Sequence, residues 1–160
     1  MLGVNRNFNS RWQLGGDIKL YNISGTPASG ALPETIGTGN ILVYTLQGIA
    51  TGLLTKRDIS VLSLSYIDSR SYTGESASLS YRSLFQDKWT FDVALRYYTQ
   101  HDNAGTDLSR WSTNLRLGYR WRDRLTLEGE YGYEKTLTES TATSDDSSRH
   151  YFSLGYRWDF

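Results

Sequence analysis

Two histidines and the carboxylates near them are the residues of this chain whose chemistry could support catalysis. His101 is followed directly by Asp102, and His150 lies near the C-terminus. Hydrolysis by a serine nucleophile requires an imidazole beside the serine and a carboxylate that orients the imidazole. Neither histidine stands beside a serine in a recognisable activating motif, so we expect that the protein is not an enzyme.

The sequence does not indicate a metal site either. The chain has no cysteine, and its two histidines are far apart in the sequence. The pair Asp145 and Asp146 lacks the ligand spacing of a calcium-binding loop. Basic and acidic side chains are equally numerous, 17 of each, whereas a nucleic-acid-binding surface needs a basic excess. We therefore expect no cofactor, no metal and no nucleic acid partner.

The elements that carry the charged residues are predicted to be β-strands, because apolar and polar residues alternate along them. Eight strands are predicted, at residues 12–22, 40–52, 59–67, 73–83, 89–98, 111–121, 125–134 and 149–160. The second is apolar on both faces in part, so its register is the least defined. Long polar connections are predicted at 24–39, 101–109 and 136–148. We assign residues 1–10 to an N-terminal extension and residues 11–160 to one β domain.

The last strand has the most informative face. Phe152, Leu154, Tyr156, Trp158 and Phe160 alternate with polar or small residues up to the end of the chain. So aromatic a face needs a larger apolar partner than a small soluble core, and lipid is the natural candidate. These residues resemble the closing strand of bacterial outer-membrane β-barrels, which commonly ends in Phe. The resemblance implies a Gram-negative outer membrane, lipids as partners, and an assembly signal at Tyr156, Trp158 and Phe160 for the outer-membrane assembly machinery.

Aromatic residues are also ordered along the other strands. The chain has 12 Tyr and 5 Trp, and indole and phenol rings prefer the headgroup level of a membrane. Two girdles are predicted, with Trp12, Trp89, Trp121 and Trp158 at one end and Tyr66, Tyr97, Trp111 and Tyr133 at the other. The stretch from Trp89 to Tyr97 spans roughly 20 Å of membrane normal, close to the ~25 Å apolar band of such barrels.

We therefore predict an all-β fold, an antiparallel transmembrane β-barrel of eight strands or, alternatively, the last eight strands of a larger barrel. No stretch has the about 20 consecutive apolar residues of a membrane helix. The mean hydropathy of −0.51 does not exclude a barrel whose strands alternate in polarity. A soluble β-sandwich binding domain is an alternative from another class, but its exterior should be rich in Glu and Lys. Here the polar face carries mainly Ser, Gly, Thr, Arg and Glu.

The polar face then lines the barrel interior, and its charged residues are Asp17, Lys19, Arg82, Asp92, Arg96, Arg116, Arg120, Glu128, Glu130, Glu134 and Arg157. Eight strands close around a lumen that side chains can fill, and buried charges must pair or stay hydrated. A closed barrel would be a salt-bridged membrane anchor that displays its loops. A wider, porin-like barrel would transport polysaccharide or small anionic solutes. A barrel-type outer-membrane enzyme is the remaining alternative.

One interior contact can be predicted in detail. If Trp121 pairs with Leu125 across the tight turn between their strands, Arg116 lies opposite Glu130. We expect an Arg116–Glu130 ion pair in the middle of the barrel. A register shifted by two would instead place Arg116 opposite Glu128.

A second resemblance concerns the wider protein. Residues 63–68, 78–85, 115–123 and 152–160 look like parts of the C-terminal barrel region of large proteobacterial outer-membrane proteins with tetratricopeptide repeats upstream. This resemblance implies an export system and an upstream periplasmic helical-repeat domain as a partner. Residues 1–8 lack the basic region, apolar stretch and cleavage site of a secretory signal. We therefore expect either that a signal has been removed or that the chain is the C-terminal part of a longer protein.

Overall fold

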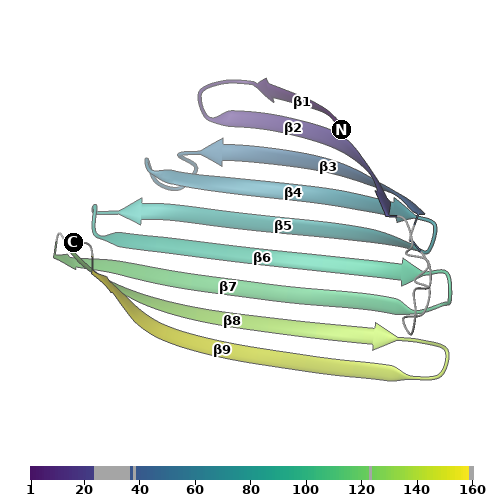
Figure 1. Cartoon of the computed structure of the whole chain (residues 1–160). Coiled ribbons are helices and arrows are strands. Elements are labelled where there is room, and N and C mark those ends of the chain that lie inside the picture. The colour runs from purple at the N-terminus through teal and green to yellow at the C-terminus, as the bar shows by residue number, and fades with distance from the viewer. Residues whose placement is uncertain (24–36, 38, 123, 159–160) are drawn as a thin grey trace, which may run out of the picture.

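In the computed structural model, the chain forms one antiparallel sheet of nine strands, and residues 1–23, 37, 39–122 and 124–158 are described. The strands are β1 (Leu2–Asn7), β2 (Trp12–Ile23), β3 (Gly39–Thr51), β4 (Asp58–Ser69), β5 (Tyr72–Phe85), β6 (Trp89–Asp102), β7 (Asp107–Arg122), β8 (Leu125–Glu139) and β9 (Ser144–Trp158). Each strand pairs with the next along the chain (Figure 1). The predicted all-β antiparallel fold is confirmed. Among the described residues, no helix is long and apolar enough to cross a membrane.

The strand count is nine rather than eight, because the N-terminal residues also form a strand. Residues 1–10, expected to be an extension, contain β1, in which Leu2 lies opposite Ile18 and Asn7 opposite Gln13. The alternation of β1 covers only six residues. Such a short pattern does not stand out in the sequence without its partner strand.

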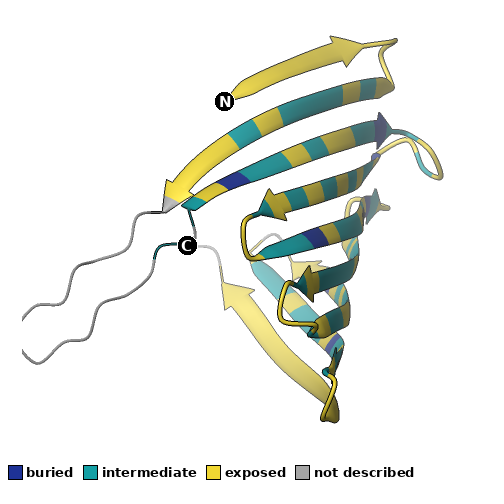
Figure 2. Ribbon diagram, turned by 90° about the vertical axis from the view of Figure 1, so that its right-hand side faces the viewer, coloured by how far each residue is buried: buried dark blue, intermediate teal, exposed yellow. Residues whose placement is uncertain are grey.

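The sheet is curved and open. Seen nearly along the strands, it forms an arc with β1 at one end and β9 at the other (Figure 2). No pairing joins these two strands within the described part of the chain, and both are exposed over their whole length. In an up-and-down sheet of nine strands the two edge strands run in the same direction, so they cannot close the ring by antiparallel pairing. The expected closure of an eight-stranded barrel on itself is therefore not found.

The sheet is a single layer with almost no interior of its own. Ile41 and Ala50 are the buried hydrophobic residues among those described. On the apolar face, Leu62 is 48% exposed, Trp111 54% and Phe152 67%. A monomeric protein in water rarely exposes so large a continuous apolar surface, so this face requires an apolar partner.

The register of β3, which the sequence left least defined, follows from its pairing with β4. Tyr44 lies opposite Tyr66 and Thr45 opposite Ser65, and the two tyrosine rings are 6.2 Å apart between centroids. Leu42, Tyr44 and Leu46 therefore share the apolar face.

Two of the predicted long connections are wrong. β6 continues to Asp102 and β7 begins at Asp107, while β8 continues to Glu139 and β9 begins at Ser144. Residues 101–109 and 136–148 are mostly strand, because antiparallel pairing uses backbone groups and tolerates polar, Ser/Thr-rich segments with a solvated face. The connection predicted at 24–39 lies outside the described residues except for Gly37 and Gly39.

The β5–β6 and β7–β8 turns lie at the end of the sheet opposite the β6–β7 and β8–β9 connections, and they set the positions of several charged residues. Between β5 and β6, Gln86 and Asp87 have φ values of 52° and 56°, and the Lys88 N–H donates to the Phe85 carbonyl at 3.2 Å. Two successive residues of positive φ make a type I′ turn, whose twist matches that of the strands.

The turn between β7 and β8 differs from the prediction. The register shifts between Arg120 and Arg122, and Arg122 rather than Trp121 lies opposite Leu125. Trp121 is thus the additional residue of a β-bulge. Asp123 in this turn lies outside the described residues, as does Phe160 of the predicted assembly signal.

Candidate functional site

The polar face of the sheet gathers all the charged residues that the sequence assigned to the interior. The cross-strand pairs place them on one side: Asp17 and Lys19 on β2, Arg82 on β5, Asp92 and Arg96 on β6, Arg116 and Arg120 on β7, Glu128, Glu130 and Glu134 on β8, and Arg157 on β9. Alternation alone was sufficient to assign them to a common face.

A ladder of alternating charge crosses this face from β5 to β9. Arg82 Nε donates to Asp92 Oδ1 at 2.5 Å, and Asp92 lies opposite Arg116. Arg116 Nη2 donates to Glu128 Oε2 at 2.6 Å, and Arg157 Nη1 lies 3.7 Å from Glu128 Oε1. Each carboxylate is therefore flanked by guanidinium groups, which suits a face where charges must be paired or hydrated.

The predicted Arg116–Glu130 ion pair is wrong, although the predicted register is confirmed. Arg116 lies opposite Glu130, but its side chain reaches the diagonal neighbour Glu128. Glu130 instead accepts hydrogen bonds from Asn114 Nδ2 at 2.6 Å and from the Tyr151 hydroxyl at 3.1 Å. Long side chains lean along the strand, so diagonal pairs compete with direct ones.

Other charged residues of this face differ in how they are compensated. Lys19 Nζ lies 3.1 Å from Asp17 Oδ2, and Arg149 Nη2 lies 3.7 Å from Glu134 Oε1. By contrast, neither Arg96 nor Arg120 takes part in an ion pair with the described residues. The polar face thus has basic side chains that remain available to a ligand.

A cavity of about 220 Å³ lies on this face next to the β5–β6 and β7–β8 turns. We call it the charged hollow. It is lined by Arg82, Leu84, Asp87, Lys88, Thr90, Asp92, Arg116, Gly118, Arg120, Thr126, Glu128 and Arg157. Lys88 and Asp87 could not be assigned to this face from strand alternation, because they lie in a turn. The short connection between β5 and β6 could have identified them, because it places the turn residues beside the charged residues at the ends of these two strands.

The predicted girdle residues lie on the opposite, apolar face, where several form ring contacts. The Trp89 and Tyr119 centroids are 4.4 Å apart, and those of Tyr97 and Trp111 are 5.2 Å apart. Such separations suit favourable aromatic pairs. Their depth in a membrane stays a prediction.

The two tryptophans that open β2 and β6 are offset along the strands. Successive cross-strand pairs connect Trp12 to Val93, which is four residues from Trp89. Strands that tilt relative to a barrel axis produce this stagger, because residues at one membrane depth shift in register from strand to strand.

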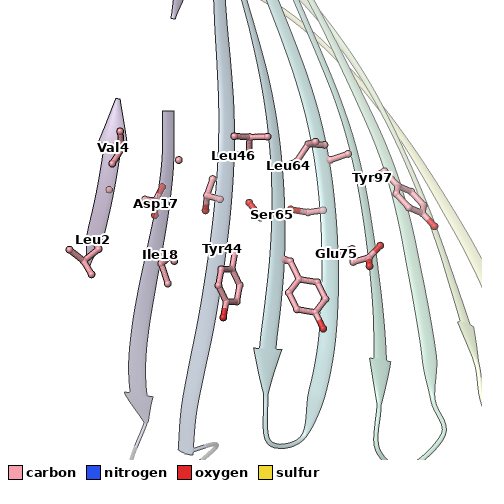
Figure 3. Close-up of a pocket in the computed structure, with 16 residues that line it drawn as sticks. Leu2, Val4, Asp17, Ile18, Tyr44, Leu46, Leu64, Ser65, Glu75 and Tyr97 are labelled. Carbon is pink, nitrogen blue, oxygen red and sulfur yellow. The ribbon is translucent and has the colours of Figure 1, made fainter. Parts of the chain in front are cut away.

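A groove of about 750 Å³ crosses the apolar face from β1 to β6 (Figure 3). Leu2, Ile18, Tyr44 and Leu64 contribute to its apolar lining. Glu75 also lines it, because the register places this carboxylate opposite Tyr66 on the apolar side of β5. The groove is therefore mainly apolar, and two acidic residues, Asp17 and Glu75, are among those that line it.

The two histidines lie apart from the charged ladder. His101 Nδ1 is 2.5 Å from Asp107 Oδ1, and His150 Nδ1 is 2.9 Å from the Tyr131 hydroxyl. Within the described residues, no group of three His, Cys, Asp or Glu side chains could hold a metal ion. That the protein is not an enzyme stays a prediction.

Comparisons with known proteins identify the fold. Neither a family model nor a curated protein matches the chain. Among solved structures, it is similar to in-vitro folded OmpT, an outer membrane protein of Vibrio cholerae, with 17% identity and a TM-score of 0.62 over 98% of this chain and 53% of that chain. The chain has an outer-membrane β-barrel fold.

Two further structures of the same Vibrio cholerae protein agree. The trimer form of in-vitro folded OmpT gives 16% identity and a TM-score of 0.63, and outer-membrane expressed OmpT gives 18% and 0.59. Each comparison covers 98% of this chain and 54% of the other. The chain thus spans about half the length of the structures it matches. The outer-membrane localisation expected from the sequence agrees with these neighbours, which are all outer membrane proteins. None of the three is described as a barrel linked to tetratricopeptide repeats.

Proposed function

We propose that the nine strands form part of the wall of an aqueous passage across the outer membrane of a Gram-negative bacterium. The observation that carries this proposal is the open sheet, with an exposed apolar face on one side and the charged ladder on the other. Only a barrel satisfies the backbone of a sheet in lipid, so further strands must complete the ring between β1 and β9.

The width of the completed barrel decides between a passage and a plug. Eight strands close around a space that side chains fill. Nine strands here leave an open arc, and their fold matches about half of longer barrel chains. A ring with more strands leaves room for water beside the polar face, and hydrated charges then favour polar or ionic solutes.

The partners that we propose follow from the two faces and the last strand. Outer-membrane lipids cover the apolar face, with acyl chains in the groove near Tyr44 and Leu64. The assembly machinery reads the last strand, and an upstream periplasmic repeat domain would serve polysaccharide export. These last two roles are supported by the resemblances in the sequence.

Single cysteines test the passage directly, because the chain has no cysteine of its own. Ser78 on β5 lies between Ser63 and Arg96 on the polar face, and Leu79 points to the apolar face. In lipid vesicles, a charged, membrane-impermeant thiol reagent should modify Ser78→Cys rapidly and leave Leu79→Cys unmodified.

The other outcomes separate the alternatives. If Ser78→Cys is unmodified while Ser71→Cys in the β4–β5 turn is modified, the polar face is closed to water and the chain is an anchor rather than a passage. Modification of both Ser78→Cys and Leu79→Cys would indicate a soluble β domain.

A further inference from the structure

We propose that the charged hollow binds a soluble oxyanion with two negative charges, of which inorganic phosphate is the simplest. This proposal rests on the proposed passage, since the polar face must be in contact with water. It assigns a ligand class to one place on that face, at the end of the sheet where the β5–β6 and β7–β8 turns lie.

Basic side chains form the rim of the hollow on the side of the turns. The Arg120 N–H donates to the Lys88 carbonyl at 2.8 Å, which holds the β5–β6 turn against β7. Arg120 lies opposite Thr126, and Thr126 lies opposite Arg157. Lys88, Arg120 and Arg157 therefore follow one another along a single cross-strand row, with a hydroxyl between the two arginines.

The floor of the hollow lies at Gly118, which has no side chain, in the next cross-strand row. Thr90 lies opposite Gly118, which in turn lies opposite Glu128. A Cβ atom added to Gly118 would be 3.5 Å from Thr90 Cβ, which is ordinary van der Waals contact. Gly118 thus leaves room in the hollow for a small ligand, and a side chain added there would occupy part of that space.

The charges of the hollow do not cancel. Five basic residues and three carboxylates line it. Each carboxylate already has a basic partner: Asp92 pairs with Arg82, Glu128 with Arg116, and Asp87 with Arg57 outside the hollow.

Lys88 and Arg120 remain, since neither forms an ion pair in the part of the chain that the structure describes. Guanidinium and ammonium groups together with hydroxyl donors suit the oxygens of a phosphate-type anion. Two basic groups without a carboxylate partner match the two charges of such an anion.

Titration with inorganic phosphate tests the proposal. The purified full chain in detergent micelles is titrated in mildly alkaline buffer, where phosphate is mainly a dianion, and the amide resonance of Gly118 is followed. Ionic strength is held constant with chloride, because exposed charges are screened by salt. We expect saturable shifts with phosphate and sulfate and none with nitrate.

Three variants locate the site. The double variant Lys88→Gln/Arg120→Gln should weaken phosphate binding at least about tenfold. Arg96→Gln, on the same face but outside the hollow, should change it less than about twofold. Gly118→Val keeps every charge and should also abolish binding; it decides the matter if the double variant does not fold.

Equal shifts with phosphate and nitrate, or unchanged binding in the double variant and in Gly118→Val, would overturn the anion site. This failure is distinguishable from failure of the passage. If Ser78→Cys is modified in lipid but phosphate does not bind, only the site is refuted. If Ser78→Cys is protected in lipid, the passage is refuted even where phosphate binds in micelles.

Discussion

Arg116 on β7 donates a hydrogen bond to Glu128, although Glu130 lies directly opposite it. Glu130 belongs to a separate network with Asn114 and Tyr151. The middle of the polar face therefore contains two neighbouring contacts of different character. One is the ion pair of Arg116 with Glu128, and in the other Glu130 accepts hydrogen bonds from uncharged side chains.

This separation can be measured with double-mutant cycles. Arg116→Met and Glu128→Met should show a coupling energy of about 0.5 kcal/mol, because the Arg116 side chain is 41% exposed and water screens the pair. The cycle of Arg116→Met with Glu130→Met should give a clearly smaller value. Urea unfolding in lipid supplies the free energies. A larger coupling with Glu130 would mean that the direct cross-strand pair prevails in the membrane.

Gly132 on β8 faces Tyr151 on β9 so closely that a methyl group at position 132 would overlap the tyrosine ring. Gly132→Ala should therefore destabilise the chain by about 0.5–1.5 kcal/mol in unfolding experiments, because the 44% exposed Tyr151 side chain must turn away and its hydrogen bond to Glu130 is lost. In a Tyr151→Ser background the same change should have little effect. Gly155→Ala is the control, since nothing lies within 4 Å of its added Cβ. Equal effects at both glycines would contradict this packing.

The two faces of the sheet were predictable because alternation depends on one backbone property, the opposite direction of successive side chains. The opposition of Arg116 and Glu130 could be predicted for the same reason. The bulge at Trp121 could not, since an extra residue in a strand leaves no mark on the pattern of side-chain types. The contact between Arg116 and Glu128 depends on how long side chains lean along the strand, which parity does not determine.

The charged hollow could not be predicted from the sequence either. It requires both an absent side chain at Gly118 and the positive φ of Gln86, which leads the turn to Lys88. A glutamine in the left-handed region is uncommon, so the turn type follows from pairing of β5 with β6 rather than from local preference.

Asp58 stabilises the turn between β3 and β4. Its carboxylate accepts the backbone N–H groups of Leu53, Leu54 and Thr55 at 2.8, 2.7 and 2.6 Å, and the residue is only 4% exposed. Asp58→Asn removes the charge and one acceptor from three part-buried N–H donors, so it should lower the free energy of unfolding by about 1–3 kcal/mol.

Asp68 at the other end of β4 is the matched control for this change. It is exposed, and its carboxylate forms no hydrogen bond with the described residues. Asp68→Asn should therefore leave urea unfolding within about 0.5 kcal/mol of the parent chain. If Asp58→Asn is as stable as Asp68→Asn, the carboxylate is not what holds the turn.

Adjacent residues on β5 test which face contacts lipid. Leu79 is 43% exposed on the apolar face, and Ser80 is on the polar face opposite Ala94. Leu79→Arg should reduce stability in lipid by about 2–4 kcal/mol, because it places a charge in the hydrocarbon layer. Ser80→Arg should cost far less, since water reaches the polar face. Comparable losses for the two variants would show that the faces are not sorted between lipid and water.

His101 provides a pH-dependent contact at the end of β6. It lies four residues beyond Tyr97 of the predicted girdle, so we expect it outside the membrane-spanning part of the strand. The hydrogen bond to the Asp107 carboxylate and the attraction between the two charges raise the pKa of His101 above its ordinary value, with a smaller contribution from Asp102. A raised pKa in the folded state stabilises the fold fully below the unfolded-state pKa of about 6.5. That stabilisation is lost as pH rises through the higher, folded-state value.

NMR titration of the His101 imidazole should show that Asp107 raises its pKa more than Asp102 does. Asp107→Asn removes both the hydrogen-bonding carboxylate and its charge, so the pKa of His101 should fall towards its ordinary value. Asp102→Asn removes the weaker attraction but keeps an amide oxygen that can accept the N–H groups of Ala104 and Thr106, so it should lower the pKa of His101 less. Because both partners are largely exposed, 62% and 60% at the side chains, added salt should narrow the difference between the parent chain and Asp107→Asn. Identical titration midpoints in those two proteins would mean that the contact between His101 and Asp107 does not persist in solution.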